Sequence, residues 1–354
     1  MWLLVWPCLL LQNVRVYGWG RVGHKMVADI AWQLISEPAQ DWIKLVLQED
    51  NNLFSTTNYT SPLSPVSIWA DAIRQRHEYE WTSKLHYVSV HNQKHPDQPC
   101  PVLSSECSFD YTIDCIQDVC AVGAIANYTS LMSDRKDDIS TARTSLMRRA
   151  AAAAATTTPF TFLNSEPAQW IKNETKLGLY FVTHFVGDIH QPLHVSRGED
   201  LGGNLIQVYF PTRSQDKGFL KLVHTNLHSV WDDFMIDRKL MEQYNNSQDV
   251  YTEALLTRLD NLTPQEKAKW LTPPKNCLGH DSWKCIASAW AQESLELAMN
   301  VAYVDEHAQE FSVSNTSIIS LEYYSTRIEV AERRLIQAGL RLAHLLESVV
   351  EKVT

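Results

Sequence analysis

The sequence predicts a mainly α-helical protein whose residues 19–354 form one compact domain, with a small β-hairpin and disulfide-pinned loops. Apolar residues recur three or four positions apart in several segments, which is the spacing of one helix face. The alternation of apolar and polar residues that marks a half-buried strand is rare. Candidate metal ligands run from Trp19 to Asp232 and must converge in space, which favours one unit over the two that the length allows.

The chain begins with a short apolar stretch. Residues 1–18 combine an apolar run from Trp2 to Leu11 with the branched Val16 and the small Gly18 near the cleavage point, which is typical of a cleaved secretory signal. The run is about half of the ~20 residues that span a bilayer. With no second long apolar stretch, we expect a soluble mature protein without a membrane anchor, beginning at Trp19. The signal is compatible with the extracellular space and with an acidic vacuole or lysosome.

Three segments carry the helical spacing clearly: Met26 to Ile35, Leu177 to Ile189, and Ile328 to Val349. The best strand pattern is Leu205 to Phe210, which predicts one strand of a hairpin. Residues Asn92 to Cys120 hold four cysteines and several prolines, which indicates a loop pinned by disulfides. A low-complexity tract, Ala150 to Thr158, receives no function.

Cysteine usage fits a secreted protein. Without the leader, an even set remains, and an even set can be fully paired in an oxidising compartment. Its members are Cys100, Cys107, Cys115, Cys120, Cys277 and Cys285. Six cysteines allow fifteen pairings, so the residues alone leave the connectivity open. Because no Cys-x2-Cys pattern occurs, thiolate metal sites are not expected.

Asn-x-Ser/Thr sequons also fit a secretory route. They predict glycosylation at Asn58, Asn127, Asn173, Asn245, Asn261 and Asn315. Only their number, taken together with the leader, carries weight, because single sequons arise by chance.

The net charge of −10 and the pI of about 5.7 disfavour a protein that holds nucleic acid by a broad basic surface. They leave room for an enzyme whose positive charge is concentrated in bound metal. Three divalent ions would add about +6 locally, and bound cations are often the largest charges in a site.

The most concentrated chemical signal is the block from His184 to His194. His184 and Asp188 are four positions apart, so on a helix they project from one face. Pro192 should end that helix and let His194 approach the same place from another direction. His190 has no matching partner and is expected only to shape the neighbourhood.

His228 and Asp232 repeat the same four-residue spacing. A single pair of this kind is most often an intrahelical hydrogen bond, but two pairs, one of them extended by His194, favour a metal site. Imidazole nitrogen together with carboxylate oxygen is a ligand set that zinc accepts when no thiolate is offered.

Three weaker signals can complete such a site. Asp71 lies one helical turn from Arg74, a spacing that alone predicts an ordinary salt bridge. His86 lies in a short apolar stretch, where alone it would be read as a core histidine. After signal removal, the free amine and carbonyl of Trp19 can chelate a metal ion, and His24 can add a third ligand.

Together these motifs resemble the zinc-dependent single-strand-specific nucleases of the S-one/P-one family, in the family's order and over nearly the whole mature chain. The resemblance rests on Trp19 with His24, Trp69-Ala-Asp71, His86-Tyr87, His184 to His194, Gly202-Gly203-Asn204, and Asn226 to Asp232. It implies the helical fold of the zinc-dependent phospholipase C and nuclease type. It also implies an endonuclease that cleaves single-stranded DNA and RNA to 5′-phosphate products and acts as a 3′-nucleotidase.

The resemblance further implies three zinc ions. One would be held by Asp71, His86, His184 and Asp188. A second would be held by His194, His228 and Asp232. The third would be held by the amine and carbonyl of Trp19, by His24 and by the other oxygen of Asp188. Zinc lowers the pKa of bound water from about 15.7 towards ~7 and so supplies hydroxide at mild pH.

By the same resemblance, Asp71 and Asp188 act in catalysis, and Arg74 stabilises charge on the phosphorus under attack. Tyr87 matches an aromatic residue that stacks a base, a contact worth ~1–3 kcal/mol per base. Because a paired base cannot offer its face, a preference for single strands follows. The family often has a carboxylate two residues after this ring, where this chain has Ser89, so the base preference stays open.

The likeness of cysteine spacing pairs Cys115 with Cys120, Cys107 with Cys285, and Cys100 with Cys277. No obligate protein partner is implied; the expected partners are single-stranded nucleic acids and 3′-nucleotides as substrates.

Two alternative functions remain at this point. A zinc phospholipase C-like phosphodiesterase shares the expected metal architecture, but Tyr87 beside His86 favours nucleic acid over lipid. A non-catalytic secreted glycoprotein that binds zinc, or a degenerate homologue, would lack a ligand somewhere, and this chain carries a suitable residue at every matching position.

Overall fold

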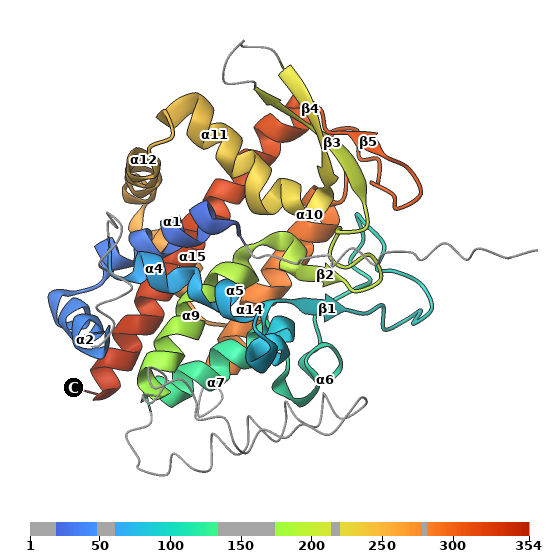
Figure 1. The fold of residues 1–354 in the computed structure, drawn as a ribbon. Helices are drawn as coiled ribbons and strands as arrows, with labels where there is room; N and C mark the ends of the chain where they lie inside the picture. Colours follow the sequence, from blue (N-terminus) through green and yellow to red (C-terminus); the bar gives the residue numbers. More distant parts are fainter. Residues whose placement is uncertain are drawn as a thin grey trace, which may run out of the picture.

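The computed structural model describes residues 19–47, 61–133, 174–213, 220–275, 277 and 282–353, and these residues are mostly helical (Figure 1). The expected signal segment, the alanine–threonine tract and the sequons at Asn58 and Asn173 lie outside the described residues. The mainly α-helical fold class is confirmed.

The helical elements fall into two runs along the chain. The first comprises α1 (Arg21–Leu34), α2 (Glu37–Leu47), α4 (Leu63–Ser67), α5 (Trp69–Ile73), η1 (His77–His86), α6 (Tyr111–Asp114), η2 (Ile116–Asp118), α7 (Ala121–Ser133), α9 (Glu174–His190) and η4 (Pro192–His194). The second comprises α10 (Leu227–Ser229), η5 (Val230–Phe234), α11 (Met235–Tyr244), α12 (Gln248–Asp260), α13 (Pro264–Leu271), α14 (Ser282–Leu297), η6 (Ala298–Ala302) and α15 (Leu321–Val353).

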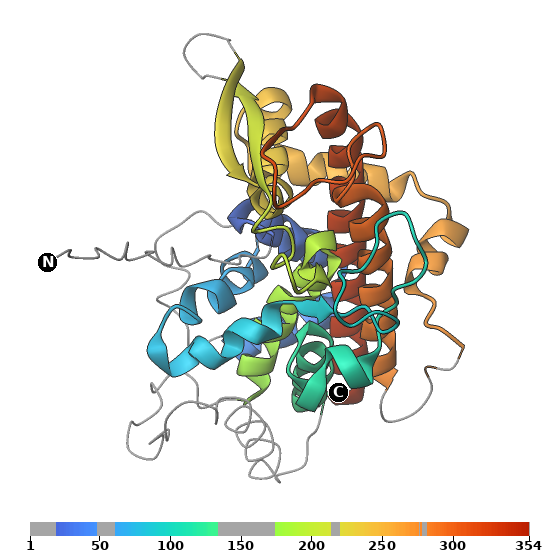
Figure 2. The same cartoon turned by 90° about the vertical axis from the view of Figure 1, so that its right-hand side faces the viewer.

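Helix α9 is the structural centre of the fold. It contacts α1, α4, α5, α7, α14 and α15, and nearly all of its side chains are buried. Phe181 stacks on both Tyr128 of α7 and Phe185, with ring centroids 4.5 and 5.2 Å apart. The long α15 runs beside it through the helical body (Figures 1 and 2). A helix enclosed on every side is held rigidly, so residues on α9 have well-defined positions.

The helices predicted from apolar spacing are confirmed. Residues 26–35 fall almost entirely in α1, 177–189 in α9 and 328–349 in α15. Helix α9 ends at His190, and Pro192 opens the 3-10 turn η4, as expected for a residue that lacks the N–H needed to continue a helix.

Two small sheets accompany the helices. Strands β1 (Val88–Val90) and β2 (Val195–Arg197) pair in parallel, with Val88 opposite Val195. This pairing places the segment after His86 beside the segment after His194, although more than a hundred positions separate them. Two candidate ligands are thereby brought to the same end of α9.

The predicted hairpin strand is confirmed within a larger sheet. Strand β3 (Gln207–Arg213) pairs antiparallel with β4 (Leu220–Asn226) and parallel with β5 (Ser317–Ile318). The sheet lies at one end of the molecule (Figure 2). Strand β4 leads directly into α10, which carries His228.

The disulfide pairing is partly wrong. Cys115–Cys120 is confirmed, but the other bonds are Cys100–Cys107 and Cys277–Cys285, not Cys100–Cys277 and Cys107–Cys285. In both observed pairs the Cα atoms, 5.8 and 5.3 Å apart, are within the reach of a disulfide. Since a sulfur forms one such bond, these crosslinks close local loops and none ties residues 92–120 to α14.

The described sequons differ in exposure. Asn245, Asn261 and Asn315 are exposed. Asn127 lies within α7, and its Nδ2, the atom that would carry a glycan, is buried and has no hydrogen-bond partner in the part of the chain that the structure describes. That sequon is therefore not offered to a glycan in the folded chain. None of the helices in the described parts of the chain combines the length and apolarity that crossing a bilayer needs.

Candidate metal centre

The structure brings the predicted side-chain ligands together in three adjoining groups. They are His24, His184 and Asp188; Asp71, His86 and His184; and His194, His228 and Asp232. Within each group the ligand atoms lie within 4.8 Å of one another. The residues come from seven helical elements spread over two hundred positions, so the convergence is a product of the tertiary fold.

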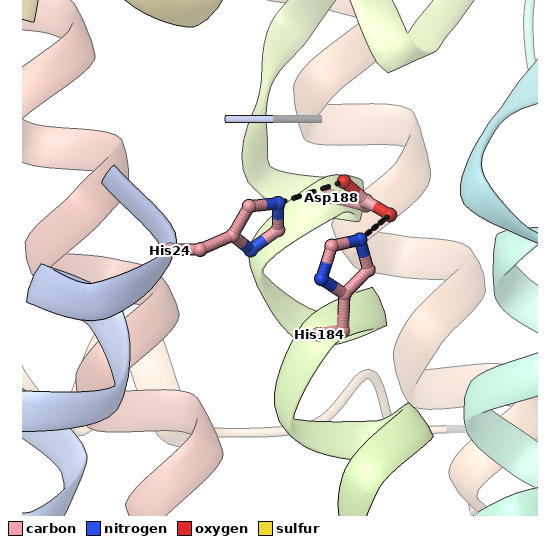
Figure 3. A group of neighbouring side chains, drawn as sticks. All are labelled: His24, His184 and Asp188. Atoms are coloured by element: carbon pink, nitrogen blue, oxygen red, sulfur yellow. Dashed lines mark ion pairs between the residues drawn. The ribbon is translucent and has the colours of Figure 1, made fainter. Parts of the chain in front are cut away.

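The carboxylate of Asp188 lies between histidines of the first and the second group. Its Oδ1 lies 3.3 Å from His24 Nε2, and its Oδ2 lies 3.2 Å from His184 Nε2 and 3.0 Å from His86 Nδ1. His24 reaches across from α1, whereas His184 stands one turn below Asp188 on α9 (Figure 3). The two oxygens of this carboxylate therefore face different nitrogen ligands.

The second group adds Asp71, whose Oδ1 lies 3.7 Å from both His86 Nδ1 and His184 Nε2. Arg74 approaches the same oxygen, with Nη2 at 2.9 Å. The predicted spacing of Asp71 and Arg74 thus forms the expected ion pair, and that pair lies at the edge of the candidate site.

The third group is built on the helical segment after β4. His228 Nε2 lies 3.2 Å from both Asp232 Oδ2 and His194 Nε2. Asp232 belongs to η5, a π-helical turn, and turns of this kind are frequent at functional sites.

Backbone carbonyls orient three of the histidines. The Nδ1 atoms of His184, His194 and His228 lie 2.5, 2.7 and 2.6 Å from the carbonyl oxygens of Ser67, His86 and Gly202. A carbonyl only accepts, so each Nδ1 donates and each Nε2 presents a lone pair to the group. Metal-ligating histidines are typically held in this way.

Glycines permit the close approaches. A Cβ on Gly187 would lie 2.8 Å from His24 Nδ1, so only glycine lets α1 come this close to α9. Gly202, whose φ is +65°, turns its carbonyl to His228. The glycines that the sequence shows beside the ligands thus have a steric reason.

Unsatisfied buried atoms show that the donor set fits a cation. Both oxygens of Asp188 and both ring nitrogens of His24 are buried and have no hydrogen-bond partner among the described residues. A buried carboxylate without such partners is costly unless it is paired or binds a metal ion. The donors are nitrogen and oxygen, which suit zinc better than the all-oxygen shells of calcium and magnesium.

The electrostatics favour neutral imidazoles around a charged carboxylate. Burial, followed by the neighbouring His184, lowers the pKa of His24, and burial together with Arg74 lowers the pKa of His86 to about 3. For Asp188, burial would raise the pKa, but His184 and His194 outweigh it and hold the pKa well below its usual value. These are the protonation states in which both residue types bind metals.

His184 behaves differently. Burial would lower its pKa, but the carboxylates of Asp188 and Asp71 outweigh that and raise it. A proton and a cation therefore compete for this nitrogen, and metal binding there is expected to release a proton.

Comparison with known proteins shows the family of the chain. The family model described as S1/P1 Nuclease matches residues 19–351. The chain belongs to the S1/P1 nuclease family. It is therefore a nuclease, which acts on nucleic acids by hydrolysing phosphodiester bonds.

Named relatives agree with this assignment. The chain is 29% identical to Endonuclease 2 of Arabidopsis thaliana over 99% of this chain and 96% of the relative. It is 26% identical to Nuclease S1 of Aspergillus oryzae, over 95% and 93%, and 27% identical to Nuclease P1 of Penicillium citrinum, over 94% and 97%.

In this S1/P1 nuclease, a cavity of about 60 Å³ adjoins the third metal group. Its lining includes Tyr87, Ser89, Leu193, Arg197, Gly202 and His228. The aromatic residue that was predicted to stack a base and one predicted metal ligand thus face the same space. Ser89 lines it too, at the position where a carboxylate was noted in the family.

The N-terminal segment of the nuclease reaches the metal groups. Trp19 is fully buried and packs on Gly23, and the N–H of Gly20 donates to the carbonyl of Asp232 at 2.9 Å. Trp19 and Gly20, the first two residues after the expected cleavage point, thus lie beside Gly23 of α1 and Asp232 of the third group.

Sequence reasoning overlooked one residue of the site. Gln191 is fully buried and forms hydrogen bonds with both Leu193 and the predicted ligand Asp232. A neutral amide has no ligand chemistry to draw notice, although Gln191 lies inside the block from His184 to His194. His190, by contrast, lies in none of the three groups and accepts a hydrogen bond from Arg341 at 2.9 Å.

Proposed function

We propose that this nuclease is a trinuclear zinc endonuclease that hydrolyses single-stranded DNA and RNA to 5′-phosphate and 3′-hydroxyl products and removes 3′-phosphates from nucleotides. The observation that supports it most is the sharing of Asp188 between His24 on one oxygen and His86 and His184 on the other. A bridging carboxylate of this kind suits two ions held close together.

The proposed ligand sets follow the three groups. One zinc takes Asp71, His86, His184 and Asp188; another takes His194, His228 and Asp232; the third takes the amine and carbonyl of Trp19, with His24 and Asp188. When bound, these ions supply hydroxide at mild pH, neutralise the phosphate and stabilise the departing oxygen. Every proposed ligand position carries a residue that can bind zinc, which disfavours a degenerate, non-catalytic homologue.

The residues around the ions bind and orient the substrate. Arg74, held by Asp71, offers its guanidinium to the equatorial oxygens of the phosphate under attack. Tyr87 offers a ring to a nucleobase in the cavity beside His228. A base must leave its duplex partner to reach that ring, which accounts for the preference for single strands.

The mature enzyme is proposed to be residues 19–354, one nuclease domain released by signal cleavage before Trp19. It would travel the secretory pathway to the extracellular space or to an acidic vacuole or lysosome. The exposed asparagines 245, 261 and 315 are the sequons best placed to carry glycans.

Purified mature protein tests the function directly. Its zinc content is measured, and its activity is assayed on single-stranded DNA, on duplex DNA, on 3′-nucleotides and on phosphatidylcholine vesicles, with and without EDTA. We expect about three zinc ions per chain and EDTA-sensitive cleavage of single strands. Turnover of lipid without cleavage of DNA would instead support a phospholipase C-like enzyme.

Replacing Arg74 by methionine is expected to lower kcat by ~10²–10³-fold, the usual cost of removing one preorganised charge-stabilising donor. With zinc in excess the zinc content should remain that of the wild type, because Arg74 is not a ligand, although loss of its contact with Asp71 is expected to weaken the binding of that one ion by about 10–100-fold. Steady-state kinetics and metal analysis on the same preparation check this. Arg76→Met, which alters an exposed arginine two positions away, is the matched control and should keep full activity.

One extra residue left in front of Trp19 is expected to cost one zinc ion and most of the activity, because it converts the chelating amine into a peptide N–H. Two preparations, one starting at Trp19 and one carrying an added alanine, are compared by N-terminal sequencing, zinc count and specific activity. Equal activity of the two would contradict the assignment of Trp19 as a ligand.

A further inference from the structure

Gln191 links two segments that carry metal ligands. Its Oε1 accepts a hydrogen bond from the N–H of Leu193 at 2.6 Å, which caps the turn η4 that ends at His194. Its Nε2 donates to Oδ1 of Asp232 at 2.5 Å, 41 positions away in the chain. The side chain has no solvent exposure.

The orientation of this amide is unambiguous. The N–H of Leu193 can only donate, and the carboxylate of Asp232 can only accept, so the oxygen of Gln191 must face the first and its nitrogen the second. Only a side chain with both functions at this separation satisfies both neighbours. Glutamate would repel Asp232, and methionine would fill the space without either bond.

The bond to Gln191 distinguishes the two oxygens of Asp232. Oδ1 accepts the hydrogen bond from the amide and lies 3.8 Å from His194 Nε2, whereas Oδ2 is free of the amide and lies closer to a histidine nitrogen, 3.2 Å from His228 Nε2. The same amide fixes the start of the turn that presents His194. One side chain thus sets the position of two of the three residues in that group.

We infer that Gln191 is a positioning residue for the third metal group: it holds Asp232 so that Oδ2 alone binds the ion, and it holds η4 so that His194 meets it. This inference rests on the zinc centre of the proposed function. Hydrogen-bond partners of metal ligands typically contribute about 10–100-fold to metal affinity.

The test measures zinc affinity, independently of nuclease activity. Mature wild-type protein, Gln191→Met and Gln191→Glu are titrated with a zinc chelator, and bound zinc is counted at each free zinc concentration. We expect both variants to bind one ion per chain about 10–100-fold more weakly than the wild type and the other two ions with unchanged affinity.

Gln248→Met is the matched control. Gln248 likewise donates from Nε2 to a buried carboxylate, Asp29, at 3.1 Å, but neither residue belongs to a metal group. This variant should bind all three ions as the wild type does. Circular dichroism verifies that each variant folds. If Gln191→Met does not fold, the zinc affinity of the isosteric Gln191→Glu, which retains the bond to Leu193, tests the role of Gln191.

The possible outcomes separate the inference from the function beneath it. Unchanged affinity for every ion, or equal weakening of all three, would overturn the role of Gln191 and leave the zinc centre standing. Fewer than two zinc ions in the wild type, with no EDTA-sensitive nuclease activity, would overturn the proposed function itself.

Discussion

Replacing Asp188 by asparagine is expected to abolish nuclease activity, with a loss exceeding the ~10²–10³-fold that follows removal of a single preorganised donor. The reason is geometric: both oxygens of Asp188 face histidine ligands, so one substitution weakens two metal groups at once. Zinc content should fall by two ions per chain. Kinetics on single-stranded DNA and a zinc count on the same sample measure the effect.

The same substitution is expected to leave the metal-free fold intact. In EDTA, His184 and His194 hold the pKa of Asp188 well below its usual value, so loss of this charge should lower the thermal unfolding midpoint modestly, while the circular dichroism of the folded chain stays unchanged. Asp29→Asn is the control, because Asp29 is also buried but accepts hydrogen bonds from Ser61 and Ser64. That variant should retain its zinc, and loss of zinc from both variants would point to a general loosening instead.

Replacing Arg334 by methionine is expected to lower the free energy of unfolding by about 3 kcal/mol, the lower end of the cost of breaking a buried ion pair. Arg334 is 1% exposed and donates to the carbonyl of His190 at 3.1 Å, to Ser294 at 2.6 Å and to Glu293 at 2.9 Å. The lower end applies because Glu293 is partly exposed and keeps a second partner, Arg341.

Thermal unfolding in EDTA measures this loss without the contribution of bound zinc. Arg333→Met, at the exposed position next to Arg334 on α15, is the control and should change stability by no more than about 0.5 kcal/mol. Equal midpoints for the two variants would show that the bonds from Arg334 to the end of α9 do not stabilise the fold.

The local part of the site follows from the sequence. A spacing of four residues fixes His184 and Asp188 on one face of a helix, and proline fixes where that helix stops, because both effects depend only on neighbouring residues. Strand β3 and the three long helices follow from periodicity for the same reason.

The long-range part does not follow in this way. The meeting of His24 with Asp188 depends on how closely α1 approaches α9, which the missing side chain of Gly187 permits. The bond from Gln191 to Asp232 joins segments whose proximity no spacing reveals. The ligand set was predicted from the motifs that this chain shares with the family, in the same order, because residue spacing alone could not predict it.

For the disulfides, the resemblance to the family predicted the wrong partners. Likeness to a family suggested long-range pairs for Cys100 and Cys277, whereas the path of each loop brings its own two cysteines together. Composition shows that a loop is crosslinked, but the partner depends on the course of the backbone between the cysteines.

The packing of α7 against α9 has a consequence for how the position of His184 is fixed. The alanine–threonine tract falls between the last residue of α7 and the first of α9, and the two helices pack directly on each other. His184 lies ten residues beyond the start of α9, roughly 15 Å along its axis. Because α9 packs against α7 and its other neighbours, the position of His184 is fixed by helix packing and not by the number of residues that join α7 to α9.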